Sequence, residues 1–306
     1  MPAPPRILGL HHVTAIASDA QKNIDFYTGV LGLKIVKINV NQDDPTSLHL
    51  YYGDDQASPG SLVTFFVYPG MGRAVEGAAG VSIVSLENLS GFATSGFEEL
   101  RDPDGLQLWL SGGNGSARLG MPVLQLALDP ADYYADDDTA VDAEDVPDPF
   151  QEFCERFLGL RLIGAQGDPA GWHHLGFSED AEGYQPLIHY SMGARPAHRG
   201  AGSVHHTAFR IATDDEQAEL HARLTEAGVE VSPIIDRVYF KSIYFREPGG
   251  ILLEVATDGP GFAVDEPPDR LGRTLCLPPW LEPHRAEIER AIPRLVLPTG
   301  EVIGGR

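Results

Sequence analysis

The pattern of apolar and polar residues predicts a chain built from short strands and amphipathic helices. The segments "SLVTFFVYP" (61–69) and "KSIYFREPGGILLEVAT" (241–257) are rich in β-branched and aromatic residues, as strands are. The second segment is interrupted by "EPGG", whose proline and glycines are typical of a turn. It therefore predicts a β-hairpin.

Two other segments have apolar residues at helical spacing. In residues 20–31 the apolar stripe follows Asp19, a suitable N-cap, and Gly32 suits the end of a helix. Residues 215–231 show the same arrangement, with Gly228 as the stop. Each predicted helix follows a predicted strand.

Internal repeats organise these elements. The segment "FYTGVLGLKIV" (26–36) matches "FCERFLGLRLI" (153–163), and "LRDPDGLQLWL" (100–110) matches "FREPGGILLEV" (245–255). The repeats predict an α+β fold of four βαβββ modules. The second module, around 81–110, leaves little room for a helix.

These repeats also predict the domain boundaries. The expected parts are residues 1–120 for the first two modules, 121–200 for the third with an acidic insertion at 129–149, 201–276 for the fourth, and 277–306 for a tail with a short helix. The insertion is too charged to bury and is broken by prolines, so we expect it to be solvated.

Composition excludes several classes of function. The net charge of −22 among 306 residues argues against nucleic-acid binding. No apolar run is long enough to span a bilayer, and the N-terminus lacks the pattern of a signal peptide. Cys154 and Cys276 are the only cysteines and form no CxxC motif, which disfavours a disulfide framework or zinc ribbon. We therefore expect a cytoplasmic protein without nucleic-acid or membrane partners.

Two distant strands open with the same doubled histidine, in "HHVTAIASD" (11–19) and "HHTAFRIATD" (205–214). Imidazole is the commonest metal-binding side chain, so the matching pairs indicate a site shared by two modules. In a regular strand, neighbouring side chains point to opposite faces. One histidine of each pair would then face the shared site and the other would face away.

These motifs resemble the vicinal oxygen chelate superfamily, which contains glyoxalases, extradiol dioxygenases and bleomycin-resistance proteins. The stretches "LHHVT", "SPGSLVTFF", "GSVHHTAFR" and "LPPWLEPHRAEIE" are most similar to its hydroquinone-type ring-cleaving dioxygenases. The similarity lies mostly in residues 6–70 and 200–290, whereas about 80–200 match poorly. The resemblance implies two cupped mixed sheets, with the first and last modules sharing one of them.

A non-haem Fe(II) oxygenase needs two imidazoles and one carboxylate on one face of the metal. The candidates are His12, His206 and Glu254, and the resemblance selects the second histidine of each pair. Glu254 lies in an apolar strand, where a carboxylate is costly to bury unless it is paired or binds a metal. The implied cofactor is Fe(II), with Mn(II) as the alternative.

Five other residues are candidates for catalysis: His11, His205, Thr14, Arg237 and Tyr244. The resemblance places His11 and His205 near the substrate, which conflicts with regular strand alternation. It assigns Arg237 to hold negative charge and Tyr244 to move protons. Thr14 shares a face with His12 and is expected to line the same pocket.

The hairpin geometry bears on Tyr244. If residues 248–250 form a three-residue loop with Gly250 in the left-handed conformation, Glu247 pairs with Ile251. Tyr244 is then directly opposite Glu254 on the same face. A two-residue loop would instead turn Tyr244 away.

The number of ligands separates the classes of function. The closing strand of the first module, 61–69, has no carboxylate, so three protein ligands are expected rather than the four usual in a glyoxalase-like site. Together with the resemblance to hydroquinone-type dioxygenases, this predicts Fe(II)-dependent cleavage of a hydroquinone-like aromatic by dioxygen. The alternatives are a glyoxalase-like lyase or isomerase using zinc or nickel, and a non-catalytic binding protein. A homo-oligomer is compatible with the sequence.

Overall fold

The structure is a computed structural model. It describes residues 5–75, 80–119, 123–125, 149–164, 173–176, 186–191 and 198–305. The predicted acidic insertion at 129–149 lies outside this set, apart from Pro149. Within these ranges, no helix has the length and apolar character needed to cross a membrane.

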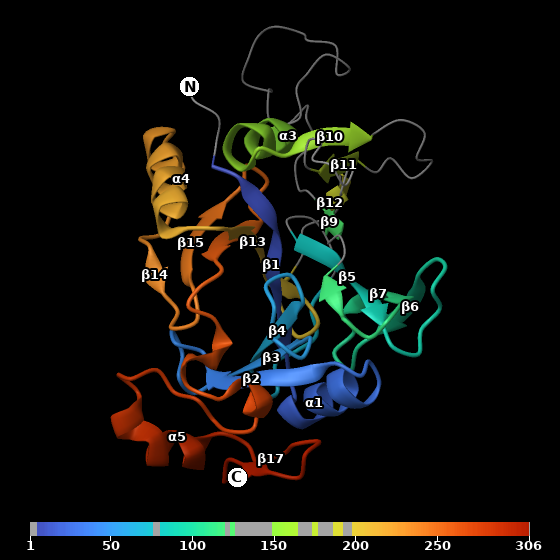
Figure 1. The fold of residues 1–306 in the computed structure, drawn as a ribbon, viewed down its shortest axis with the longest axis vertical. Coiled ribbons are helices and arrows are strands. Elements are labelled where there is room, and N and C mark those ends of the chain that lie inside the picture. Colours follow the sequence, from blue (N-terminus) through green and yellow to red (C-terminus); the bar gives the residue numbers. More distant parts are fainter. Residues whose placement is uncertain are drawn as a thin grey trace, which may run out of the picture.

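An eight-stranded mixed sheet joins the first and last modules, with β1 beside β13 at its centre (Figure 1). Its order is β14-β15-β16-β13-β1-β4-β3-β2. The strands are β1 (Ile7–Ala17), β2 (Lys34–Val40), β3 (Leu48–Gly53), β4 (Leu62–Val67), β13 (Val204–Ile211), β14 (Ile235–Asp236), β15 (Lys241–Arg246) and β16 (Leu252–Thr257). The expectation that these two modules share a sheet is confirmed.

The second mixed sheet comes from the middle of the chain, in the order β10-β11-β12-β9-β5-β7-β6, with β8 paired to β5. Its strands are β5 (Gly80–Leu89), β6 (Glu98–Arg101), β7 (Gln107–Gly112), β8 (Arg118–Leu119), β9 (Val123–Gln125), β10 (Arg161–Gly164), β11 (His173–Gly176) and β12 (Pro186–Ser191). Residues 80–119 contain no helix, as the short spacing predicts.

Helices α1 (Ala20–Gly29) and α4 (Asp214–Glu226) follow the first strands of their modules. The Asp19 side chain accepts a hydrogen bond from the backbone N–H of Lys22, which caps α1 as predicted. Gly32 and Gly228 have φ angles of 69° and 80°, a left-handed conformation that ends each helical segment.

The other helical segments are short. They are α3 (Pro149–Phe153), which continues into a π-helix (Cys154–Leu158), α5 (Arg285–Ala291), and 3₁₀ turns at Phe262–Val264, Pro268–Arg270 and Glu282–His284. The tail also forms the small ribbon of β17 (Leu295–Val296) and β18 (Val302–Ile303). Helix α5 lies within the part of the chain that the sequence assigns to the tail.

The two sheets share one apolar core. Buried residues of the first sheet, such as Val13 and Phe209, belong to the same cluster as Leu86 and Leu108 of the second. The core fixes the backbone of β1 and β13 from behind. These two strands carry the doubled histidines, so the core also positions them.

Candidate metal centre

The three predicted ligands converge in the shared sheet. Glu254 Oε2 lies 2.9 Å from His206 Nε2 and 3.4 Å from His12 Nε2, and the two Nε2 atoms are 3.2 Å apart. All three side chains are buried. The imidazoles come from β1 and β13, and the carboxylate comes from β16.

Strand register explains this convergence. On β1 and β13, which are antiparallel, Thr14 is the partner of His206 and Ala208 is the partner of His12. Ala208 also pairs with Glu254 on the parallel strand β16. The three ligands therefore occupy neighbouring rungs of three adjacent strands.

Two β-bulges explain why the histidines are doubled. In the pairing of β1 with β13, one residue is skipped between Leu10 and His12 on β1, and one is skipped between Val204 and His206 on β13. His11 and His205 are these unpaired extra residues. A bulge breaks the alternation of side chains, so both members of each pair can face the same site. Of the two extra histidines, His205 lines the cavity described below, whereas His11 is buried against His12 and Phe240 and does not line it.

Each extra histidine contacts its neighbouring ligand. The Nδ1 atoms of His11 and His12 are 2.9 Å apart, and those of His205 and His206 are 2.8 Å apart. An imidazole that binds a metal through Nε2 carries its proton on Nδ1 and donates it to a nearby acceptor. Burial is the main reason that the pKa values of His11 and His205 fall to about 3. Both rings are therefore neutral acceptors for that proton.

The residues fit a cation. Glu254 Oε2 is buried and has no aligned hydrogen-bond donor among the described residues, although two imidazole nitrogens lie beside it. Two donor atoms held about 2.1 Å from one ion at a right angle lie about 3.0 Å apart, which is close to the observed separations. An unpartnered carboxylate oxygen facing two imidazoles is the donor set of a metal site.

Protonation states agree with this assignment. Burial lowers the pKa of His206, with the neighbouring Glu254 acting in the opposite direction. Burial acts to raise the pKa of Glu254, but the imidazoles of His12 and His206 outweigh it and hold that pKa well below its usual value. The carboxylate is therefore ionised.

Ser242 orients the carboxylate. Its hydroxyl donates a hydrogen bond to Glu254 Oε1, which leaves Oε2 directed at the imidazoles. We expect Ser242→Ala to weaken Fe(II) binding by about tenfold, because groups that orient metal ligands contribute factors of this size. Chelator competition would measure the affinity. An unchanged affinity would show that Glu254 is held in place without this bond.

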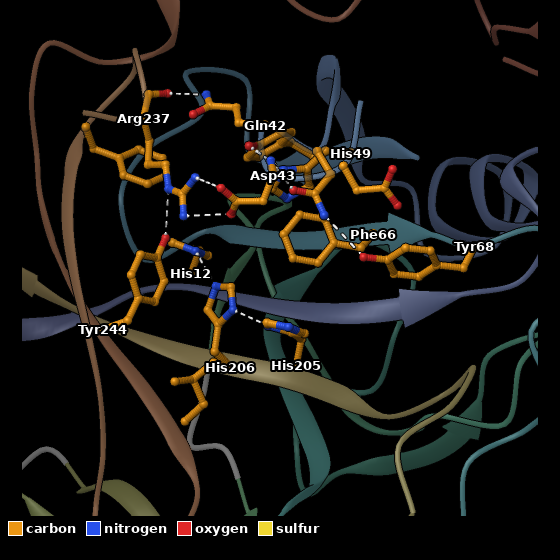
Figure 2. Close-up of a pocket in the computed structure, with 15 residues that line it drawn as sticks. His12, Gln42, Asp43, His49, Phe66, Tyr68, His205, His206, Arg237 and Tyr244 are labelled. Atoms are coloured by element: carbon orange, nitrogen blue, oxygen red, sulfur yellow. Dashed lines mark hydrogen bonds and ion pairs between the residues drawn. The ribbon is translucent and has the colours of Figure 1, made fainter. Parts of the chain in front are cut away.

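A cavity of about 380 Å³ is lined by two of the ligands, His12 and His206 (Figure 2). Its walls include His12, His205, His206, Tyr244, Arg237, His49, Tyr51, Phe66 and Phe240. The tail does not contribute to it, since its lining residues, all of them described, lie between 12 and 252. The tail is therefore packing rather than a cover for the site.

Tyr244 lies where the three-residue loop predicts. Gly250 has a φ angle of 90°, the Glu247 N–H bonds the Ile251 carbonyl, and Tyr244 pairs with Glu254. Arg237 Nε donates to Tyr244 Oη at 3.2 Å. The phenol and the guanidinium thus form one unit at the edge of the centre.

Sequence reasoning missed the partners of Arg237. Its guanidinium donates to both carboxylate oxygens of Asp43, at 3.1 and 3.3 Å, and the Gln42 side chain donates to its carbonyl (Figure 2). These bonds connect two loops that are almost two hundred residues apart in the chain. The segment "NQDD" gave no sign of this pairing.

Thr14 is not among the residues that line the cavity. Its hydroxyl is fully buried and bonds Thr64 Oγ1 at 2.7 Å, since β4 lies directly beside β1. Thr64 in turn bonds His49 Nε2 at 2.9 Å, and it is His49 that reaches the cavity. Thr14 therefore acts behind the cavity wall.

Thr64 also occupies a special position. It pairs with Thr14, two residues after His12, as Glu254 pairs with Ala208, two residues after His206. The first module thus has a hydroxyl where the last has its carboxylate. This agrees with the expectation of three protein ligands.

Comparison with known proteins gives the same picture. A family model described as the Glyoxalase/Bleomycin resistance protein/Dioxygenase superfamily matches residues 9–110 and 147–255. MhqA of Bacillus subtilis (strain 168), named as a ring-cleaving dioxygenase, is 36% identical over 93% of this chain and 98% of its own length. A chlorohydroquinone/hydroquinone 1,2-dioxygenase of Sphingobium indicum is 29% identical over 95% of this chain and 98% of its own. The crystal structure of a Bacillus subtilis protein named as a dioxygenase has a TM-score of 0.77 at 29% identity, and covers 94% of this chain and 97% of its own.

The chain belongs to the Glyoxalase/Bleomycin resistance protein/Dioxygenase superfamily. Within it, the chain is a ring-cleaving dioxygenase, which is an oxidoreductase. The relatives of this class match the chain along almost their whole length. Dioxygenases of this superfamily depend on a metal, and the three converging side chains form the candidate site.

Proposed function

We propose that this chain opens the ring of a para-diphenol such as hydroquinone with dioxygen, using Fe(II) held by His12, His206 and Glu254. The observation that carries the proposal is the three-ligand set with Thr64 in the place of a fourth. Two imidazoles and one carboxylate leave three positions open, which suits Fe(II) oxygenases. The printed name of the Sphingobium indicum relative supports the substrate class.

Bound Fe(II) would supply a route for electrons from a phenolate to dioxygen. The chain's own groups handle protons and charge around it. His205 lines the cavity, and because its Nδ1 accepts from His206, the neutral ring carries its proton on Nε2 and can donate a hydrogen bond to a substrate oxygen that approaches the metal ligands. Arg237 provides a fixed positive charge at the edge of the centre, suited to developing negative charge on the substrate.

Tyr244 is suited to donate a proton. Burial, with Glu254 acting in the same direction, raises the pKa of its phenol above the usual value, so the group stays protonated. Tyr244 Oη accepts a hydrogen bond from Arg237 Nε, so the phenol proton does not point at the guanidinium and can be donated to another acceptor. The Arg237 guanidinium acts against the rise in pKa because it stabilises the phenolate, so a phenol held beside it can deliver its proton to the opened ring.

We expect Tyr244→Phe to lower kcat by about 10²-fold, since a positioned acid contributes a factor of this order. Fe(II) affinity should stay within about twofold, because the phenol is not a ligand and Phe keeps the ring in place. Stopped-flow measurement of dioxygen consumption and a chelator titration would separate the two effects. A large loss of Fe(II) affinity would instead make Tyr244 part of the metal site.

The direct test is dioxygen uptake by protein purified without oxygen and reconstituted with Fe(II) or Mn(II), with hydroquinone and catechol offered separately. Uptake with hydroquinone and Fe(II) that disappears in Glu254→Ala would support the proposal. No uptake with either phenol, despite one bound metal per chain, would reject it in favour of a lyase or a binding protein. Greater activity with Mn(II) than with Fe(II) would show that the proposed metal should be manganese instead of iron.

The remaining expectations stay part of the proposal. They are catabolism of aromatic compounds in the cytoplasm, a small aromatic substrate, no nucleic-acid or membrane partner, and compatibility with a homo-oligomer. Cys154 and Cys276 are both buried and do not form a disulfide, which suits a reducing compartment.

A further inference from the structure

The first and last modules approach the centre in the same way, so their residues can be compared position by position. Tyr51 pairs with Thr64 on adjacent antiparallel strands, as Tyr244 pairs with Glu254. Both phenols line the cavity. The centre therefore has a second tyrosine on the side that lacks a carboxylate.

The two tyrosines have different partners. Tyr244 Oη receives a hydrogen bond from the cation of Arg237. Tyr51 Oη lies 2.8 Å from His49 Nδ1, and the chain of bonds continues from His49 Nε2 to Thr64 and on to Thr14. Burial, reinforced by the nearby His12 and His206, lowers the pKa of His49 well below its usual value. Tyr51 thus ends a neutral hydrogen-bond chain.

The hydrogen bonds that link these neutral groups can be oriented in either of two directions. In one, Tyr51 donates to His49 and its oxygen can accept a further bond. In the other, His49 donates to Tyr51 and the phenol proton is free. Among the described residues, His49 is the only hydrogen-bond partner of the Tyr51 hydroxyl. A hydroxyl group on a ligand matches both directions because it both donates and accepts.

We infer that Tyr51 receives the second hydroxyl of the diphenol, the one that does not reach the metal. This inference rests on the proposed function. The two hydroxyls of a para-diphenol lie at opposite ends of the ring, so they cannot both bind one ion, whereas those of catechol can. The cavity must therefore offer a hydrogen-bonding group away from the ligands. Tyr51 is that group, and His49 is the residue that positions its hydroxyl.

Tyr68 and Asn41 are a second polar pair on the cavity wall. Asn41 Nδ2 already donates to Tyr68 Oη at 3.2 Å, and Tyr68 is only half-buried. Figure 2 shows Tyr68 on the far side of Phe66 from His206. Tyr51 is buried and its hydroxyl is positioned by His49, which makes it the better candidate to receive the second hydroxyl.

The test pairs a change in the protein with a change in the ligand. Affinities of the Fe(II) protein for hydroquinone and for phenol are measured without oxygen by calorimetry, in the unmodified chain, Tyr51→Phe and Tyr68→Phe. A buried hydrogen bond is worth roughly a factor of ten, so we expect the unmodified chain to bind hydroquinone about tenfold more tightly than phenol. In Tyr51→Phe the ratio should fall to within about twofold, with the phenol affinity unchanged. Tyr68→Phe should keep the ratio.

Because Phe preserves the ring of Tyr51 against Phe262, at a centroid distance of 5.3 Å, the variant is expected to fold. The variant His49→Leu is an independent test, because it should reduce the ratio of hydroquinone affinity to phenol affinity without changing the phenol affinity.

A ratio that persists in Tyr51→Phe, or that is lost in Tyr68→Phe instead, would overturn the inference. So would equal affinities for the two ligands in the unmodified chain. A preference for hydroquinone that depends on Tyr51, without any dioxygen uptake, would support the recognition site and reject the proposed ring cleavage. Failure of the unmodified chain to bind Fe(II) would reject both.

Discussion

Replacing Glu254 with glutamine is expected to abolish metal binding and dioxygen uptake. The variant keeps the shape of the side chain but removes the single negative charge among the three converging ligands. Loss of one of three ligands should lower Fe(II) affinity by about three orders of magnitude or more, beyond the ten- to hundredfold cost of losing a group that only orients a ligand. Metal analysis and chelator competition would measure it.

Thermal unfolding adds a second readout for the same variant. Fe(II) should raise the Tm of the unmodified chain, because a ligand that binds only the folded state stabilises it. Glu254→Gln should lose this shift while its metal-free Tm stays equal or rises, since a buried charge without a cation is unfavourable. Glu99→Gln, on the exposed strand β6, is the matched control and should behave like the unmodified chain. A normal shift in Glu254→Gln would remove Glu254 from the metal site.

The largest effect on stability is expected from Lys37→Met. Lys37 is fully buried, and its ammonium lies 2.6 Å from Asp265 Oδ1 and 2.7 Å from Glu266 Oε2. Removing one partner of a buried ion pair leaves uncompensated charge and typically costs about 3–5 kcal/mol. We expect a loss of about 3 kcal/mol, because Asp265 is partly exposed to water. Urea unfolding followed by circular dichroism would measure it.

The matched control is Lys34→Met. Lys34 is on the same strand and pairs with Asp55, but both side chains are exposed, so the change should cost less than about 1 kcal/mol. Equal losses in the two variants would show that burial does not strengthen the Lys37 network.

The same network makes stability depend on pH. Burial acts to raise the pKa of Glu266, but hydrogen bonds, first from Lys37, outweigh it and lower that pKa. The contribution of Glu266 is therefore present at neutral pH and is lost as the pH falls through the lowered value. Lys37→Met should flatten this acid dependence.

Much of the centre could be predicted from the sequence because its signals are local. A glutamate inside an apolar strand and two matching histidine pairs are visible without any knowledge of the fold. The place of Tyr244 followed from the length of one turn. The bulges at His11 and His205 could not be predicted, since nothing in either segment marks an extra residue and the cause lies in how β1 and β13 pair.

The residues that were missed depend on distant parts of the chain. Asp43 meets Arg237 across 194 positions, and Lys37 meets Asp265 across 228. In "KIVKINV", Lys37 looks like an ordinary polar residue of a strand, and its burial depends on carboxylates supplied by the distant fourth module. Tyr51 was overlooked because its significance comes from a comparison of registers between modules.

The pairing of β1 with β13 also sets an order of events during synthesis. The ribosome completes His12 long before His206, and Glu254 follows later still. For most of its growth, a nascent chain therefore holds only one of the three candidate metal ligands. Until β13 appears, the central edge of β1 has no strand to pair with and is prone to associate wrongly. A metal ion can therefore be captured only by a chain whose first and fourth modules have already met.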